Sequence, residues 1–313
     1  MKARIIRSSK REFDCRIEET KEVVSAKALG NLLKGQNQLV AGDYVTLELQ
    51  ENEYMITHLA KRKNEVFRII RRENKKKITA SNIDVLIIVS AVSAPEYKQG
   101  LVDRYLLRSE QWGIPAFVIF NKMDEFNEQI NLQFESERLR ALNVRCFETS
   151  AKTEHRPLLL EGIEELKNSI QSKTALFLGQ SGVGKSKLIS ALSDGSIELV
   201  SNALAKVGKG THTTSWAEII DLENFELVDS PGVRSFSIDD FHPDDLQACF
   251  PDLQIYFSQC KFSNCNHQSN SKGCAFENLD ENEQETKIVL SRLESYLRFK
   301  EEIESRPEWD KNY

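Results

Sequence analysis

The sequence predicts a chain of three parts: a small all-β barrel, an α/β domain with a mostly parallel sheet, and a metal-binding, partly helical C-terminus. Short strands separated by turn residues fill the first 60 residues, and apolar strands alternate with helices from about residue 80. Three cysteines then fall within 15 residues of one another. We expect the three parts to span residues 1–75, 76–240 and 241–313.

Composition narrows the class of protein. Of the 313 residues, 40% are hydrophobic and 29% are charged, which is ordinary for a soluble folded chain. The longest aliphatic run, Val85 to Val89, is far shorter than the roughly 20 residues that a membrane span needs. No apolar core follows the charged N-terminus, so a secretion signal is not expected. We therefore expect a cytoplasmic location, no membrane partner and a monomer.

The N-terminal part is predicted to be a barrel of five strands. That number suits an OB-like fold, which often binds RNA, although another small barrel or sandwich without a ligand fits the pattern as well. Residues 61–77 hold nine Lys/Arg and two Glu, which are either a local phosphate contact or a solvated linker on a chain of net charge −6. The expected strands are Lys2–Ile6, Phe13–Ile17, Val23–Ala28, Tyr44–Leu49 and Tyr54–Leu59.

Strand and helix patterns alternate in the central part, which predicts parallel strands with helices on both faces of the sheet. The expected strands are Val85–Val89, Ala116–Phe120, Val144–Phe147, Ala175–Leu178, Ala217–Ile220 and Phe225–Val228. The expected helices are Gly100–Gln111, Phe134–Leu142, Ile163–Ser172 and Lys185–Leu192, with a charged C-terminal helix at Glu283–Glu304.

A glycine-rich motif separates one of these strands from the helix that follows it. The motif runs from Gly179 to Ser186, fits G-x-x-x-x-G-K-[ST], and has the strand–loop–helix context of a P-loop. Its backbone N–H groups are expected to hold phosphate oxygens beside a helix N-terminus. Lys185 is expected to reach the β and γ phosphates, and Ser186 to ligate Mg²⁺. The predicted phosphate-binding residues are Gly179, Gln180, Ser181, Gly182, Val183, Gly184, Lys185, Ser186 and Lys187.

A guanine-reading motif precedes the P-loop. Asn121, Lys122, Met123 and Asp124 fit N-K-x-D at the end of an expected strand. Guanine presents N1–H and an exocyclic amino group, which Asp124 can accept together, whereas adenine would leave this carboxylate unpaired. We expect Lys122 to lie along the plane of the base and Asn121 to fasten its loop to the P-loop.

Two more motifs belong to the same nucleotide site. The run from Thr149 to Lys152 resembles the GTPase segment in which a backbone N–H, here of Ala151, meets guanine O6. Residues 229–232 fit D-x-x-G, whose aspartate orients a Mg²⁺-bound water and whose glycine N–H senses the γ-phosphate. The site residues predicted here are Ser150, Ala151, Lys152, Asp229 and Gly232.

The glycine-flanked, threonine-rich segment 208–214 is typical of a switch loop. Thr214 is the favoured Mg²⁺ ligand, and Thr213 is the second choice. Val233 stands where Ras-like GTPases place a water-orienting Gln, so His212 is the candidate for positioning or deprotonating the attacking water. The alternative is that His212 only stabilises the loop while a partner positions the water.

The order of these motifs differs from that of ordinary GTPases, which begin with the P-loop. Here N-K-x-D and S-A-K come first, followed by the P-loop, the switch loop and D-x-x-G. This order indicates a circular permutation, and it makes D-x-x-G lead directly into the Cys-rich segment.

The Cys-rich segment contains the predicted metal ligands Cys260, Cys265, His267 and Cys274. Three thiolates and one imidazole make a closed tetrahedral Zn²⁺ site of the structural kind. The alternative is a group of free core cysteines beside an incidental histidine.

With these features together, the chain resembles the family of small-ribosomal-subunit-dependent GTPases known as RsgA or YjeQ. Asn82-Ile83-Asp84 is similar to the family's entry into its GTPase domain, and residues 210–214 resemble its G-R-H-T-T switch, with Thr211 in place of arginine. Ser230 replaces the commoner threonine of D-T-P-G. Neither change removes a proposed ligand, but Thr211 cannot make the phosphate or RNA contacts of a guanidinium.

The resemblance implies a late-stage maturation or checkpoint factor of the 30S subunit that hydrolyses GTP to GDP and phosphate, with stimulation by the small subunit. It also implies rRNA contacts by the barrel and the zinc-binding part. Two alternatives remain, a GTP-switched rRNA-binding scaffold that does not hydrolyse GTP and a permuted GTPase of large-subunit assembly.

Overall fold

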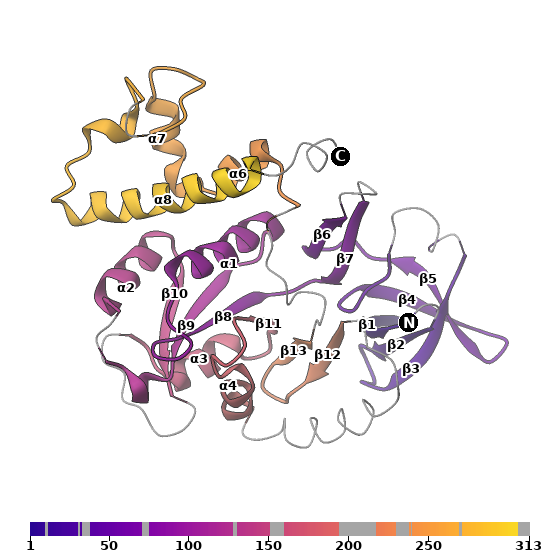
Figure 1. Ribbon diagram of the computed structural model, residues 1–313. Helices are drawn as coiled ribbons and strands as arrows, with labels where there is room; N and C mark the ends of the chain where they lie inside the picture. The colour runs from indigo at the N-terminus through magenta and orange to yellow at the C-terminus, as the bar shows by residue number, and fades with distance from the viewer. Residues whose placement is uncertain are drawn as a thin grey trace. The chain divides into compact units, whose positions relative to one another are not determined.

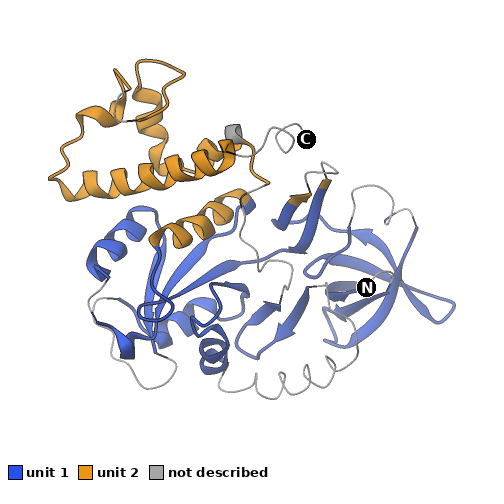
Figure 2. Cartoon of the chain, in the orientation of Figure 1, with its two compact units in different colours: residues 1–68, 76–98, 112–236 blue, residues 69–75, 99–111, 237–313 orange. Residues whose placement is uncertain are grey.

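The computed structural model describes residues 1–9, 12–30, 32, 38–70, 75–127, 130–150, 160–193, 217–229, 238, 240–268 and 271–305. The chain divides into two compact units (Figure 2). The first unit holds residues 1–68, 76–98 and 112–236, and the second holds residues 69–75, 99–111 and 237–313. The three-part boundaries expected from the sequence stay a prediction.

Five strands at the N-terminus form the predicted barrel (Figure 1). They are β1 (Lys2–Ser8), β2 (Glu12–Ile17), β3 (Val23–Ala28), β4 (Tyr44–Gln50) and β5 (Glu53–Leu59). Their order is β1-β2-β3-β5-β4, and β4 pairs back onto β1 to close the barrel. Side chains alternate between the interior and the surface, so Phe13, Cys15 and Ile17 of β2 all enter the apolar core.

The basic run contains two strands that the sequence analysis did not predict. Strands β6 (Glu65–Ile70) and β7 (Lys75–Ser81) pair as a separate two-stranded sheet. Val66, Ile78 and Ala80 are buried while the neighbouring lysines stay outside. The many charged residues of the segment concealed these strands, because they interrupt the apolar positions from which a strand is predicted.

The central sheet of the first unit is mostly parallel, as predicted. It contains β8 (Val85–Ala91), β9 (Ala116–Asn121), β10 (Arg145–Thr149), β11 (Thr174–Leu178), β12 (Glu218–Asp221) and β13 (Glu226–Asp229), in the order β10-β9-β8-β11-β13-β12. All these neighbours pair in parallel except β12, which is antiparallel to β13. The connecting helices of this unit are α2 (Leu132–Ala141), α3 (Ile163–Ile170) and α4 (Lys185–Leu192).

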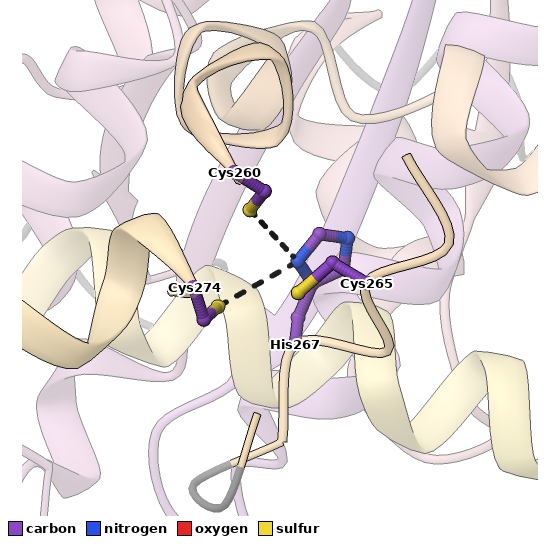
Figure 3. A group of neighbouring side chains, drawn as sticks. All are labelled: Cys260, Cys265, His267 and Cys274. Carbon is purple, nitrogen blue, oxygen red and sulfur yellow. Dashed lines mark hydrogen bonds between the residues drawn. The ribbon is translucent and has the colours of Figure 1, made fainter. Parts of the chain in front are cut away.

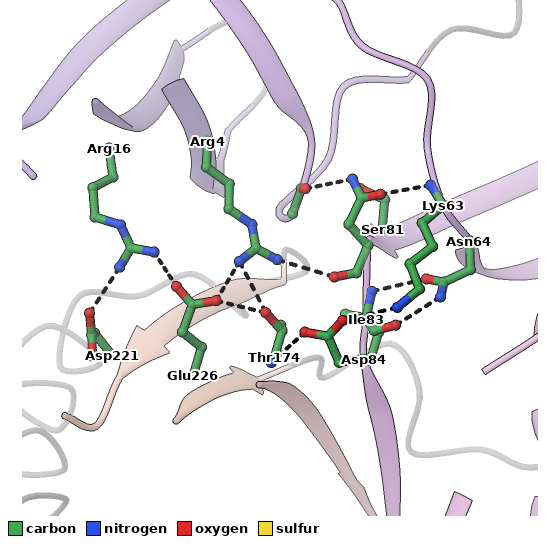
Figure 4. Close-up of polar contacts among 12 residues, drawn as sticks. Arg4, Arg16, Lys63, Asn64, Ser81, Ile83, Asp84, Thr174, Asp221 and Glu226 are labelled. Atoms are coloured by element: carbon green, nitrogen blue, oxygen red, sulfur yellow. Dashed lines mark hydrogen bonds and ion pairs between the residues drawn. The ribbon is translucent and has the colours of Figure 1, made fainter. Parts of the chain in front are cut away.

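The barrel and the central sheet are joined in one eleven-stranded sheet, because β1 also pairs with β12. Figure 4 shows polar side chains on both sides of this joint. Arg4 and Arg16 of the barrel both form ion pairs with Glu226 of β13. Arg4 also donates to Thr174 Oγ1 at 3.0 Å, and Arg16 donates to Asp221 Oδ2 at 3.0 Å. The joint therefore connects two barrel arginines to three central strands.

The second unit is largely helical. Its elements are α1 (Gln99–Trp112, with residues 99–111 in this unit), α6 (Pro243–Ala248), α7 (Gln254–Gln259), α8 (Gln284–Glu304) and the short 3-10 helices Pro251–Leu253 and Ala275–Asn278. Arg292 of α8 donates to Asp103 of α1 at 2.9 Å, and Arg108 of α1 donates to Asp240 at 2.6 Å. Among the described residues, no helix is both long enough and apolar enough to cross a membrane.

Candidate functional site

The P-loop joins β11 to α4, and its backbone depends on glycine. Gly182 and Gly184 have φ angles of 86° and 96°, a region that other residues rarely adopt. A Cβ atom at Gly184 would lie 2.5 Å from Asn121 Nδ2, so any side chain there would have to displace Asn121. The Lys185 ammonium donates to the carbonyl oxygens of Gly179 and Gln180, at 2.6 and 2.7 Å. These two hydrogen bonds within the loop hold its backbone in a curled conformation.

The guanine motif and the P-loop are bonded to each other. Asn121 Nδ2 donates to the carbonyl oxygen of Val183 at 2.8 Å, which is the fastening expected of this asparagine. Thr149 Oγ1 donates to Asn121 Oδ1 at 3.0 Å, and both side chains are buried. Three motifs that lie far apart in the sequence therefore meet in one hydrogen-bonded group.

The carboxylate that is predicted to read guanine is held by the neighbouring motif. Ser150 Oγ donates to Asp124 Oδ1 at 2.7 Å, a contact that the sequence analysis did not predict. Lys122 takes a left-handed backbone conformation with φ of 65°, and its ammonium donates to the carbonyl oxygen of Ala94. Met123 between them is buried, so it anchors the segment while Lys122 and Asp124 remain accessible.

The described motif residues gather at one edge of the central sheet. Residues 121–124, Ser150 and the P-loop follow the carboxyl ends of β9, β10 and β11, and Asp229 ends β13. Ligands of open parallel sheets bind at this edge. Six predicted site residues lie outside the described parts of the chain and stay predictions, namely Ala151, Lys152, His212, Thr213, Thr214 and Gly232.

The second unit brings together the four predicted metal ligands, Cys260, Cys265, His267 and Cys274 (Figure 3). Their ligand atoms all lie within 4.8 Å of one another. His267 Nδ1 is 3.5 Å from Cys260 Sγ and 3.8 Å from Cys274 Sγ. A tetrahedral zinc site would separate its nitrogen and sulfur ligands by about 3.6 Å. The donor set and its spacing therefore fit a metal-binding cluster.

Local backbone geometry and a small aromatic core position these ligands. Gly273 has a φ of 76°, which allows this part of the loop to pass close to Lys261. The backbone N–H of Lys261 donates to the Gly273 carbonyl at 2.9 Å. The His267 ring packs 4.7 Å from Phe257 and 5.6 Å from Phe276. Burial, together with the charge of Lys300, lowers the pKa of His267 and favours the neutral imidazole that a metal requires.

The thiols of the cluster crowd one another. Burial is the largest influence on the pKa of Cys274, and the neighbouring thiols add to it, so this pKa rises to about 11. A cation would remove that penalty, because it stabilises thiolates held at such short distances. Without a cation the raised pKa keeps this thiol protonated, so it is the donor set and its spacing, rather than the pKa, that indicate a metal.

The permuted motif order, the P-loop bonded to N-K-x-D, the barrel and the Cys3His cluster define a circularly permuted P-loop GTPase with two appended parts. The family described as RsgA GTPase matches residues 59–239, which is more than half of the chain. This chain belongs to the RsgA family.

Individual relatives extend the similarity over nearly the whole chain. A protein of Bacteroides fragilis, named small ribosomal subunit biogenesis GTPase RsgA, is 30% identical over 97% of each chain. A Flavobacterium psychrophilum protein of the same name is 32% identical over 86% of this chain and 82% of its own. The crystal structure of YjeQ from Thermotoga maritima covers 98% of this chain and 99% of its own, with a TM-score of 0.75 and 26% identity.

Proposed function

We propose that this chain hydrolyses GTP to GDP and phosphate and acts as a late-stage maturation or checkpoint factor of the small ribosomal subunit, which stimulates the hydrolysis. The observation that carries the proposal is the hydrogen bond from Asn121 to Val183, which joins the guanine motif to the P-loop. Full-length similarity to a relative named small ribosomal subunit biogenesis GTPase RsgA supports the choice of ribosomal subunit.

Different residues of the site are proposed to bind the base, the phosphates and the metal ion. Asp124 and the backbone of Ala151 read the base, while Lys185 and the P-loop amides balance the charge of the phosphates. Ser186 and Thr214, with Thr213 as the alternative, would hold Mg²⁺. When bound, that ion neutralises charge on the β and γ phosphates.

Five further residues complete the proposed site. Asp229 would orient a water bound to Mg²⁺, and the Gly232 N–H would sense the γ-phosphate. Lys152 follows Ala151 in the sequence, and Lys187 follows Ser186, so both are placed in the nucleotide site. His212 positions or deprotonates the attacking water, because Val233 cannot do so.

The Cys3His cluster is proposed to bind one structural Zn²⁺. Four protein ligands fill a tetrahedral shell, so no coordination position is left open for a substrate. The zinc-binding part, the barrel and the basic run 61–77 are proposed to contact rRNA. Nine positive side chains within 17 residues supply a local attraction for phosphates on a chain that is acidic as a whole. We propose that the protein acts as a cytoplasmic monomer.

The proposal is tested by measuring GTP hydrolysis by the purified chain alone, with small ribosomal subunits and with large ones. We expect strong stimulation by the small subunit only, lost in His212→Ala and retained in the control His242→Ala. Stimulation by the large subunit alone would favour a factor of large-subunit assembly. GTP binding without any stimulated hydrolysis would favour a switched scaffold.

A further inference from the structure

A segment outside all the nucleotide motifs is tied to the guanine motif along its length. Residues 92–98 follow β8, and the Val92 N–H donates to the Asn121 carbonyl at 3.0 Å. The ring of Tyr97 lies 5.8 Å from that of Phe120 at the end of β9. We call residues 92–98 the brace. Because both ends of the brace are fixed on β9 and its continuation, its middle can act as a rigid support.

The middle of the brace makes two contacts with the guanine motif itself. The Lys122 ammonium donates to the Ala94 carbonyl, which draws the side chain of Lys122 across the brace. Ser93 Oγ donates to Glu125 Oε2 at 2.6 Å, and both side chains are half-buried. A hydrogen bond of this length to a carboxylate is of the strong, charge-assisted kind.

Glu125 closes the short turn that carries Asp124. This turn is a single 3-10 helix, Met123–Glu125, and it has no side-chain hydrogen bond at its N-cap. Helices this short do not hold themselves together, because few backbone bonds offset the cost of ordering the residues. Side-chain anchors at its ends therefore decide how firmly Asp124 is oriented.

Asp124 needs a fixed orientation, because its two carboxylate oxygens must face two donors on the base in one plane. Ser150 holds one of those oxygens at 2.7 Å. We propose that Ser93 and Glu125 are positioning residues for guanine recognition: their hydrogen bond fixes the turn and thereby aims Asp124 at the base. This inference rests on the proposed function, since it assumes that the bound nucleotide carries guanine.

The proposal predicts a loss that depends on the base. Guanine has the exocyclic amino group that Asp124 accepts, whereas hypoxanthine lacks it but keeps N1–H and O6. If the brace aims Asp124, a variant that releases the turn loses affinity for GDP more than for inosine diphosphate. General damage to the loop would weaken both nucleotides alike.

The test measures GDP and inosine diphosphate binding to the full chain by titration calorimetry. For Ser93→Ala and Glu125→Ala we expect about tenfold weaker GDP binding and a smaller change for inosine diphosphate, which offers Asp124 only the N1–H donor. The double variant should match the singles, because both remove the same hydrogen bond. Glu125→Gln keeps an oxygen that accepts from Ser93 and should bind GDP nearly as the wild type does. Glu161→Ala, which breaks a half-exposed ion pair with Arg145 elsewhere in the unit, is the control.

Two other outcomes overturn the proposal. Equal losses for both nucleotides, or GDP affinities unchanged in both alanine variants, mean that the brace does not aim Asp124. Melting curves of each variant verify that the chain is folded. Failure of the proposed function is recognised separately, because the wild-type chain would then show no preference for GDP over adenosine diphosphate.

Discussion

The nucleotide motifs and the Cys3His cluster are both constellations of a few side chains, but they are assembled in opposite ways. Asn121 and Val183 are 62 residues apart and are brought together by paired strands of the central sheet. The four metal ligands fall within 15 residues and lie on short helices and loops. One site is positioned by long-range backbone hydrogen bonds, and the other by a local chain and a small core.

The two sites therefore differ in how far their structure depends on a bound ligand. Strand pairing and the aliphatic core around β8 and β11 hold the nucleotide motifs in place without a nucleotide. The cysteines lie on short helices and loops beside a small aromatic core, and a bound cation would stabilise their thiolate forms. Metal binding to such a cluster contributes to folding itself. Five predictions can break or sharpen this contrast.

The largest effect is expected from loss of a metal ligand. Cys265→Ser should abolish stoichiometric zinc and remove the cooperative unfolding of the second unit, since structural zinc contributes on the order of 10 kcal/mol. GDP affinity should change by no more than about twofold, because the two sites are assembled independently. Zinc analysis, melting and titration measure the three quantities. Cys146→Ala is the matched control, and a zinc-free variant with unchanged melting would contradict the contrast.

A strong effect on the nucleotide site alone is expected from Gly184→Ala. The new Cβ would have to move Asn121 Nδ2, 2.5 Å away, and the backbone φ of 96° would be strained. Strain and the lost hydrogen bond together should weaken GDP binding by about 100-fold. Gly30→Ala, at a position with no heavy atom within 4 Å of the added carbon, should bind GDP normally. Unchanged affinity of Gly184→Ala would show that the P-loop tolerates another backbone.

A moderate effect on stability is expected at the joint between the barrel and the central sheet. Glu226→Gln would leave Arg4 and Arg16 partly buried without their shared carboxylate. Breaking such a pair should lower the free energy of unfolding by about 2–4 kcal/mol. Urea denaturation measures the loss, and GDP affinity should stay close to that of the wild type.

The same residue gives a pH dependence with a definite sign. Burial acts to raise the pKa of Glu226, but Arg4, Thr174 and Arg16 outweigh burial and hold this pKa below its ordinary 4.5. The carboxylate therefore stabilises the fold fully above pH 4.5, and the contribution is lost as the pH falls through the lowered pKa. The stability gap between wild type and Glu226→Gln should narrow below pH 4.5. A gap that stays constant down to acid unfolding would refute this assignment.

The smallest effect is expected for an exposed ion pair within the barrel. Lys27 and Glu53 are 2.6 Å apart, but more than half of each side chain is exposed. Glu53→Ala should therefore leave the free energy of unfolding nearly unchanged, because solvent screens the pair. The comparison with Glu226→Gln in the same denaturation experiment isolates the effect of burial. A loss as large as that of Glu226→Gln would show that burial is not the cause.

Much of this architecture could be predicted from the sequence, because spacing and composition encode it directly. The barrel strands, the permuted sheet and the Cys3His set follow from alternation and from ligand types at short separations. Contacts between side chains could not be predicted in this way. The bonds of Ser150 to Asp124 and of Ser93 to Glu125 depend on how separate loops meet at the sheet edge.

The pairing of β1 with β12 also has a consequence for handling the protein. Strand β12 ends the central sheet, and β1 of the barrel pairs with the start of its outer edge, where Arg7 lies opposite Glu218. Uncovered edges expose unpaired N–H and C=O groups that recruit strands of other molecules. A shortened chain beginning after the barrel would expose this edge and would be prone to aggregate. The barrel is therefore also expected to protect the nucleotide-binding sheet from aggregation.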